Sequence, residues 1–254
     1  MSSNESILLE RGSIYFFYRP RVQRAQVKNE SDIQRLHMIL RPDHKGLYRM
    51  IAIGKKELPA VEHGAQERNW GFVELVTENA ESLREVLSEE RYSTKTRGER
   101  KLPAARAAGE GVYLLAVHHN HTHLAYSLEL PRSPGDVQQE LHIEEKASYI
   151  ITVKNPQRPS PSGAGLPRRG KAQYPDYLMN KFEGKRFTDV EPPEFLNYEG
   201  CELVMVSASK EPQKELGVSP RGRKETSKTA DLFKEFNIDP SSAIVKPLFK
   251  GEWQ

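Results

Sequence analysis

A basic segment from Arg91 to Arg106, RYSTKTRGERKLPAAR, carries the densest set of side chains suited to binding an anion. It holds six cationic residues against one acidic residue, together with three hydroxyl side chains and a glycine. Guanidinium forks, small hydroxyls and a loop whose amides can turn inward are the groups that recognise phosphate. The segment therefore predicts a phosphate-binding or nucleic-acid-binding site made of Lys95, Arg97, Arg100, Lys101 and Arg106.

A second basic run, Arg19, Arg21 and Arg24, directly follows an aromatic stretch from Tyr15 to Tyr18. Aromatic side chains beside arginine suit single-stranded nucleic acid, because bases stack on the rings while the cations neutralise the backbone. Neither run matches a Walker loop, an RNP motif or a GxGxxG turn. The alternative stays open that the basic segment is a solvated connector and the aromatic residues belong to the core.

A histidine-rich run, HHNHTH, occupies positions 118 to 123. If a two-residue turn lies at Asn120-His121, His118 and His123 face each other with Cβ atoms ~5 Å apart, which is close enough to share a metal ion. A turn one place nearer the N-terminus pairs His118 with His121 instead. Stable zinc sites need three or four ligands, so the run indicates a metal site, a solvated tip or a pH-sensitive contact.

Signals for other catalytic chemistry are weak. The chain has no Gly-x-Ser-x-Gly elbow and no Cys-x-x-Cys pair, and Cys201 adjoins an apolar stretch where a thiol is usually inert. No pair of carboxylates stands out from those expected on solvated faces and turns. We therefore predict no catalytic residue and no cofactor, and leave open whether the protein is an enzyme.

Composition sets further limits. The 254 residues carry 38 Lys and Arg against 35 Asp and Glu, and the resulting net charge of +3 is too small to imply nucleic acid by itself. One cysteine cannot form an internal disulfide, which favours a reducing compartment. The N-terminal residues lack a signal-peptide core, and the longest uncharged run, Gly111 to Leu128, has histidines at its centre. We expect a cytoplasmic protein with no membrane contact.

Hydrophobic patterning predicts the elements that position these residues. Strands are expected at 14–18, 48–53, 70–76, 148–154 and 202–207, where β-branched, aromatic and apolar residues concentrate. A capping box at Ser31–Gln34, followed by Ile33, Leu36 and Leu40 on one helical face, predicts a helix that ends before Pro42. Further helices are expected at 80–90, from Pro134 through Leu141, after Pro175 and at 230–236.

The stretch from Gly111 to Leu130 predicts a β-hairpin with its turn at Asn120-His121. The facing pairs are then Val117 with Leu124, Leu115 with Tyr126, and Tyr113 with Leu128. These six side chains share one apolar face, because side chains alternate along a strand. We expect Leu115 and Tyr126 to be buried neighbours and His118 and His123 to be accessible to solvent.

Together these elements predict an α+β fold, with an antiparallel or mixed β-sheet and a few short packed helices. The motif strand, Asp-Ile/Val-Gln helix, strand occurs twice, which suggests either a duplicated strand-helix-strand unit or coincidence. The main domain is expected at 13–209, with a mobile Pro-, Gly- and Ser-rich loop at 155–173. Residues 210–254 are expected to form a basic linker and an apolar C-terminal docking tail.

The function that follows is a cytoplasmic, non-enzymatic binding protein for a phosphate-rich ligand, most simply nucleic acid such as RNA or single-stranded DNA. One alternative is a metal-dependent enzyme or sensor that uses the histidine tip. Another is a protein-interaction or assembly factor, in which the C-terminal tail binds a protein partner.

Overall fold

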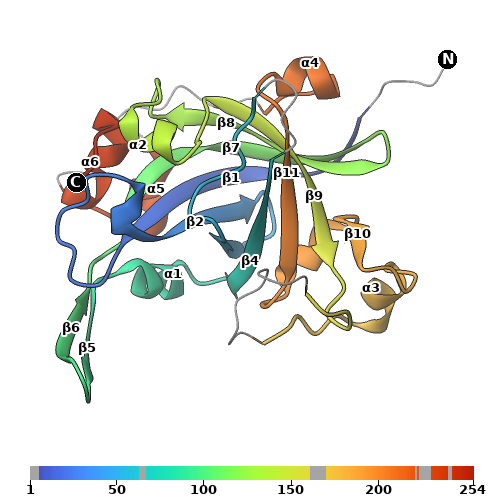
Figure 1. Cartoon of the computed structure of the whole chain (residues 1–254). Coiled ribbons are helices and arrows are strands. Elements are labelled where there is room, and N and C mark those ends of the chain that lie inside the picture. The colour runs from blue at the N-terminus through green and yellow to red at the C-terminus, as the bar shows by residue number, and fades with distance from the viewer. Residues whose placement is uncertain (1–5, 63–66, 161–169, 221, 223–229, 240–241) are drawn as a thin grey trace.

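Antiparallel strands close on one another to form an eight-stranded barrel in the computed structural model (Figure 1). The structure describes residues 6–62, 67–160, 170–220, 222, 230–239 and 242–254. The barrel strands are β1 (Ile7–Pro20), β2 (Ile33–Pro42), β3 (Tyr48–Ile53), β4 (Arg68–Thr77), β7 (Arg106–His118), β8 (His121–Leu130), β9 (Lys146–Lys154) and β11 (Glu202–Ser209). Their order around the barrel is β9-β11-β4-β3-β2-β1-β7-β8, and pairing of β8 with β9 closes it.

The barrel closes at strand β9, which pairs with β11 on one side. On its other side, the two halves of β9 pair with two different strands. Its first half pairs with β8, from Lys146 to Ile150. Its second half pairs with the short strand β10 (Phe187–Asp189). Strands β8 and β10 therefore lie one after the other along the same side of β9. The first residue of β8 lies beside the last residue of β10.

The predicted α+β architecture is wrong, because the sheet closes on itself and the helices are short covers rather than a layer. The longest described helix, α1 (Ala80–Leu87), has eight residues. The others are α2 (Asp136–Glu140), α3 (Asp176–Asn180), α4 (Pro212–Leu216), α5 (Asp231–Phe236) and α6 (Lys246–Lys250). Short 3₁₀ turns lie at η1 (Glu30–Asp32), η2 (Pro193–Asn197) and η3 (Ala243–Val245). None of the helices in the described residues is long and apolar enough to cross a membrane.

The helix expected after Ser31 is strand β2, and this removes the duplicated strand-helix-strand unit. Asn29, not Ser31, caps a short 3₁₀ turn at η1. The chain then alternates as a strand does, with Leu36, Met38 and Leu40 in the main core and Ile39 in a second cluster outside the barrel. Apolar residues at positions 33, 36 and 40 fit a helical period, but the intervening apolar residues fit a period of two.

Alternating residues of β1 show how the barrel is filled. Ile14, Phe16 and Tyr18 point into the main core, whereas Tyr15 and Phe17 lie on the outer wall. Separate segments close the two ends. Trp253 contacts Tyr18, where β1 ends, with ring centroids 5.2 Å apart. At the other end, where β1 begins, η2 is attached to the barrel.

The outer wall of β1 to β3 is covered by α1 and by the C-terminal helices. Phe236 of α5 contacts the rings of Tyr15 and Phe17, with centroids 5.1 and 5.6 Å away. Glu110 of β7 accepts hydrogen bonds from the backbone N–H groups of Asp231 (2.7 Å) and Leu232 (3.2 Å). Apolar residues of the C-terminal segment thus pack against the barrel of their own chain.

The hairpin of β7 and β8 has the predicted buried face but a different register. The turn lies at His119-Asn120, whose φ values of 47° and 64° suit a two-residue hairpin turn. His118 therefore pairs with His121, and Leu115 faces Leu124 rather than Tyr126. Leu115 and Tyr126 are buried, as expected. His118 and His123 are only 8% and 4% exposed, so the prediction that they are accessible is wrong.

The Pro-rich segment 155–173 is attached to the body at both ends. The N–H of Asn155 donates to the carbonyl of Arg186 (2.8 Å), and that of Ala172 to Gly200 (3.2 Å). Its middle, 161–169, lies outside the described residues, as do positions 221 and 223–229 of the expected basic linker.

Candidate functional site

The predicted basic segment folds into a hairpin that projects from the barrel at the lower left of Figure 1. Strand β5 (Glu90–Thr94) pairs with β6 (Gly98–Leu102) in a sheet of two strands, and no residue of either strand is buried. Such a hairpin is marginally stable alone. Gln23, in the loop after β1, anchors it: its N–H donates to the carbonyl of Lys101 (2.8 Å) and its Nε2 to that of Glu99 (3.2 Å).

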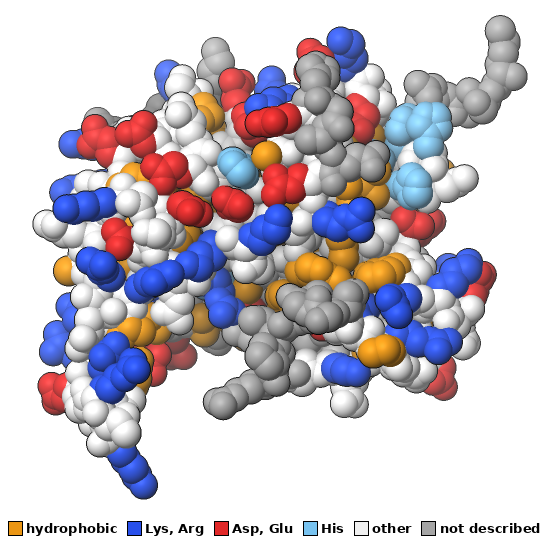
Figure 2. All heavy atoms as spheres, viewed as in Figure 1, with side chains coloured by type: hydrophobic (Ala, Val, Ile, Leu, Met, Phe, Trp, Pro, Cys, Tyr) orange, Lys and Arg blue, Asp and Glu red, His pale blue; other side chains and the backbone are white. Residues whose placement is uncertain are grey.

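Three cations of the hairpin carry charge that no described acidic group pairs with. Lys95 and Arg97 are exposed in the turn, and Arg100 is half-buried on β6. Lys101 differs, because its Nζ lies 2.7 Å from Glu89, which also pairs with Arg91. The tip is therefore more positive than the base. Lys and Arg side chains are visible along the projecting hairpin at the lower left of Figure 2.

An aromatic side chain lies among these cations. Tyr92 faces Arg100 across the hairpin and is 37% exposed. Beside the hairpin, a hollow of about 400 Å³ is lined by Gln23, Arg91, Tyr92, Ser93, Glu99, Arg100 and Lys101. A ring next to a guanidinium in an open hollow can accept a stacked base while neighbouring cations meet phosphates.

Arg106 lies at the start of β7 on the barrel, where it pairs with Tyr18. Its Nη2 donates to the carbonyl of Ala25 at 2.6 Å, so it holds the loop after β1. That loop brings two further basic residues to the base of the hairpin. Arg21 shares the carbonyl of Ile33 with Lys56, and Arg24 pairs with Asp32 (3.3 Å).

The histidine run forms the tip of the β7–β8 hairpin and meets α4, β10 and the residue before β1. The rings of His118 and His123 are 5.9 Å apart, measured between centroids. Burial, followed by the neighbouring histidines, lowers the pKa of His123 to about 4. Across the described parts of the chain, no three His, Cys, Asp or Glu side chains are already placed to hold a metal ion.

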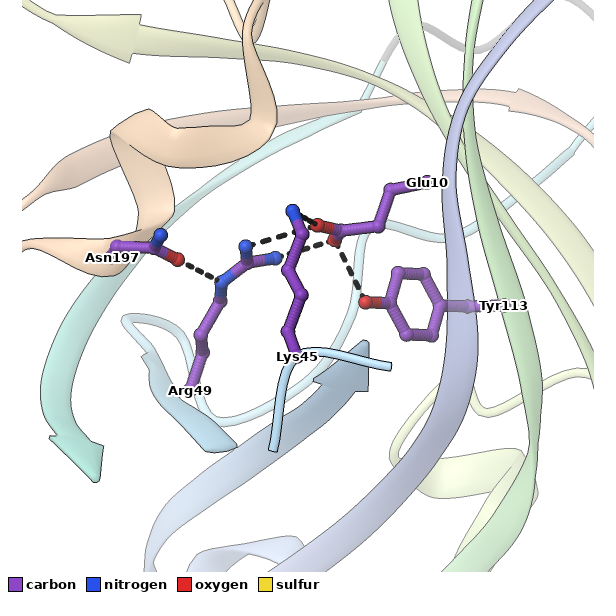
Figure 3. A network of polar contacts seen from close by, with 5 residues as sticks. All are labelled: Glu10, Lys45, Arg49, Tyr113 and Asn197. Carbon is purple, nitrogen blue, oxygen red and sulfur yellow. Dashed lines mark hydrogen bonds and ion pairs between the residues drawn. The ribbon is translucent and has the colours of Figure 1, made fainter. Parts of the chain in front are cut away.

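A buried polar network that sequence reasoning missed lies where β1 begins (Figure 3). Glu10 accepts two hydrogen bonds from Arg49 (2.5 and 3.0 Å) and one each from Lys45 and Tyr113 (both 2.8 Å). Burial favours the neutral acid, but Arg49 and Lys45 outweigh it and lower the pKa of Glu10. Arg49 also donates to Asn197 of η2 (2.7 Å). With four donors the carboxylate is no free base, and the network attaches η2 to the barrel.

A second missed cluster lies on the outer wall and depends on a β-bulge. Met50 faces Leu75 and Ile51 faces Val73, so Glu74 is the extra residue of the bulge on β4. Bulges re-aim side chains, and Glu74 reaches past β3 to His37 of β2 (3.1 Å) and to Arg35. Burial lowers the pKa of His37, although Glu74 opposes the shift. Both carboxylate oxygens are thus occupied, which favours a role in holding strands together.

One signal in the sequence marks both clusters. Glu10, Arg49, His37 and Glu74 are polar residues inside otherwise apolar or alternating strands. Such residues are buried only when they are paired. Their partners lie 37 and 39 positions away, and only the strand order brings them together.

Comparison of the chain with protein-family models, with curated proteins and with solved structures finds no match in any of the three.

Proposed function

We propose that the protein binds a phosphate-rich ligand, most simply single-stranded nucleic acid, through the β5–β6 hairpin, without catalysing a reaction. The observation that carries this proposal is a set of three cations with no acidic partner among the described residues, on a hairpin whose strands bury no residue.

Folding of the barrel does not require these three cations. Exposed charges contribute little to stability, and the hairpin adds nothing to either large core cluster. Its polar surface is therefore available to a ligand. Lysine and arginine bind phosphate oxygens strongly, and Tyr92 beside Arg100 adds a surface on which a base can stack.

The contacts of the predicted residues support a narrower centre for the proposed site. Lys95, Arg97 and Arg100 form the centre of the proposed site. Lys101 shares Glu89 with Arg91 and contributes less charge. Arg106 acts through the loop after β1, where Arg21 adds a cation, whereas Arg24 pairs with Asp32 and contributes less charge.

The test is fluorescence anisotropy with a labelled 20-nucleotide poly(U) RNA, titrated at 50 to 200 mM salt. Each neutralised phosphate contributes a slope of about −0.7 in a plot of log affinity against log salt concentration. With three to five contacts, the fourfold rise in salt should weaken binding roughly ten- to hundredfold. The double variant Arg97→Ala, Arg100→Ala should flatten the slope by about 1–2 units.

A matched control removes two other exposed cations, Lys171→Ala and Lys181→Ala, which lie before and directly after α3. It has the same net charge as the hairpin variant and should keep the wild-type slope. An equal flattening of the salt slope in both variants would show that RNA binding depends only on net charge. No binding of RNA, single-stranded DNA or polyphosphate by the wild type at 50 mM salt would overturn the proposal.

A further inference from the structure

A second hollow, of about 400 Å³, lies on the outer wall of the barrel beside α1 and α5. Its apolar lining includes Phe17, Leu87, Ala105, Phe236, Ile238 and Ile244. It shares no described lining residue with the hollow beside the β5–β6 hairpin. Sites for small molecules are concave and mainly apolar, with a few polar groups that orient the ligand, and this hollow has that character.

One polar residue of the lining, Arg84 of α1, has a donor without a partner. Its Nη2 pairs with Glu81, which lies one turn earlier on the same helix. Its Nε is buried and has no hydrogen-bond partner among the described residues. A buried N–H is costly to leave unpaired. An acceptor oxygen brought by a ligand would remove this cost.

We infer that the hollow binds a small, uncharged, mainly apolar molecule that carries one carbonyl oxygen. The apolar body of the ligand packs against Phe17, Leu87 and Phe236, and its oxygen accepts the Nε–H of Arg84. Burial of apolar surface supplies the affinity, and the single hydrogen bond sets the orientation of the ligand.

The charges around the hollow favour an uncharged ligand. Glu81 already balances the charge of Arg84, and two further acidic residues, Glu89 and Asp239, are exposed at the rim. A carboxylate bound to Arg84 would lie near these acidic groups. An ammonium group would be repelled by Arg84 and could not accept its Nε–H. A carbonyl oxygen accepts the hydrogen bond without adding a charge.

The size of the hollow limits the ligand. Pockets for drug-sized molecules measure about 300–1,000 Å³, so this hollow is near the lower end of the range. We therefore expect an apolar body of about two fused aromatic rings. Ala104 also lines the hollow and is half-buried, so a larger side chain at this position would take up part of the space.

The test uses the full chain and prodan, an uncharged naphthalene ketone whose fluorescence shifts to shorter wavelength in an apolar site. Titration should show saturable binding of one prodan per chain. Displacement of prodan by matched naphthalenes then measures the role of the oxygen. 2-Acetylnaphthalene should bind about tenfold more tightly than 2-ethylnaphthalene, which lacks the oxygen. It should also bind more tightly than 2-naphthoate, and the reverse order would overturn the assignment of an uncharged ligand.

Arg84→Met keeps an unbranched side chain but removes the guanidinium group. This variant should bind 2-acetylnaphthalene and 2-ethylnaphthalene with equal affinity. The comparison is made between two ligands on one variant, so a change in the amount of folded protein does not affect it. A preference for the ketone that persists in Arg84→Met would show that Arg84 is not the donor and would overturn the proposal.

Ala104→Phe should occupy the hollow and weaken prodan binding at least about tenfold. Ala208→Phe is the control, because it makes the same change at a half-buried alanine of β11 outside the lining, and it should bind prodan like the wild type. Equal losses in these two variants, or no saturable binding by the wild type, would overturn the proposal. RNA binding at the β5–β6 hairpin is measured separately, so either proposal can fail without the other.

Discussion

The β7–β8 and β5–β6 hairpins have the same antiparallel backbone pairing and opposite roles. In the β7–β8 hairpin most residues are buried, and one face fills the barrel. In the β5–β6 hairpin no strand residue is buried, and cations dominate its tip. The difference shows that antiparallel pairing alone does not determine what a hairpin does. The side chains on its faces decide whether it holds the fold together or remains free for a ligand.

The largest expected effect is on the free energy of unfolding, and it should differ clearly between the two hairpins. Leu115→Ala should lower the free energy of unfolding by about 2–5 kcal/mol, because it leaves a cavity in the main core. Tyr92→Ala, on the projecting hairpin, should change it by less than about 0.5 kcal/mol. Urea denaturation of both variants measures the contrast. Similar losses would mean that the projecting hairpin also supports the fold.

Only a substitution in the buried β7–β8 hairpin should change how stability depends on pH. Burial raises the pKa of Glu110 to about 8, so the folded state keeps a proton that the unfolded state loses above its pKa of 4.5. The contribution of Glu110 to stability therefore falls as pH rises from about 4.5 to 8. Glu110→Gln removes the titrating group, although its amide can accept only one of the two backbone N–H bonds. Relative to the wild type, its stability should therefore rise by roughly 2–4 kcal/mol between pH 4 and pH 8, whatever the difference at pH 4.

Thermal unfolding across this pH range provides the measurement, and Glu99→Gln on the exposed hairpin is the matched control. The control should follow the wild type at every pH. If the unfolding midpoint of Glu110→Gln also follows that of the wild type at every pH, Glu110 is ionised in the folded protein.

The next effect concerns ligand binding and should appear only at the projecting hairpin. Tyr92→Ala should weaken poly(U) binding by about 1–3 kcal/mol, the range for loss of one stacked base. Tyr92→Phe should keep the affinity, because the ring provides the stacking surface. A loss with Tyr92→Phe equal to that with Tyr92→Ala would indicate that the hydroxyl, not the ring, contacts the ligand.

The smallest effect should be local. Gly98 has a φ of +63° in open space, so Gly98→Ala strains the hairpin by about 1–2 kcal/mol without a steric clash. Hydrogen exchange of the β5–β6 amides should accelerate, while the global unfolding midpoint should hardly change. Gly98→Asn should exchange more slowly than Gly98→Ala, because asparagine tolerates this region better. A fall in the global midpoint would show that the hairpin unfolds with the barrel.

Local features of this fold were predictable from the sequence, but its closure was not. The run Tyr48–Ile53 matches β3, and Ala80 begins α1 as expected. Ile33, Leu36 and Leu40 fit a helical period, whereas Leu36, Met38 and Leu40 fit a strand period, and tertiary pairing decides between them. Closure depends on β9 pairing with both β8 and β11, and no local pattern encodes two distant partners.

The candidate sites show the same limit. The charge of the segment from Lys95 to Lys101 indicated an exposed surface, but its hairpin was not foreseen. Arg106 belongs to the same basic run, yet strand pairing places it on the barrel opposite Tyr18. At the histidine run, moving the turn by one position changed the partner of His118, which decides which side chains meet.

The contacts of Phe236 also have a consequence for synthesis of the chain. Tyr15 and Phe17 leave the ribosome early, but the residue that covers them is made more than two hundred positions later. At roughly 5–20 residues per second, their apolar wall remains without this cover for on the order of tens of seconds. During that time the growing chain exposes aromatic surface that a chaperone would bind and that neighbouring nascent chains could adhere to.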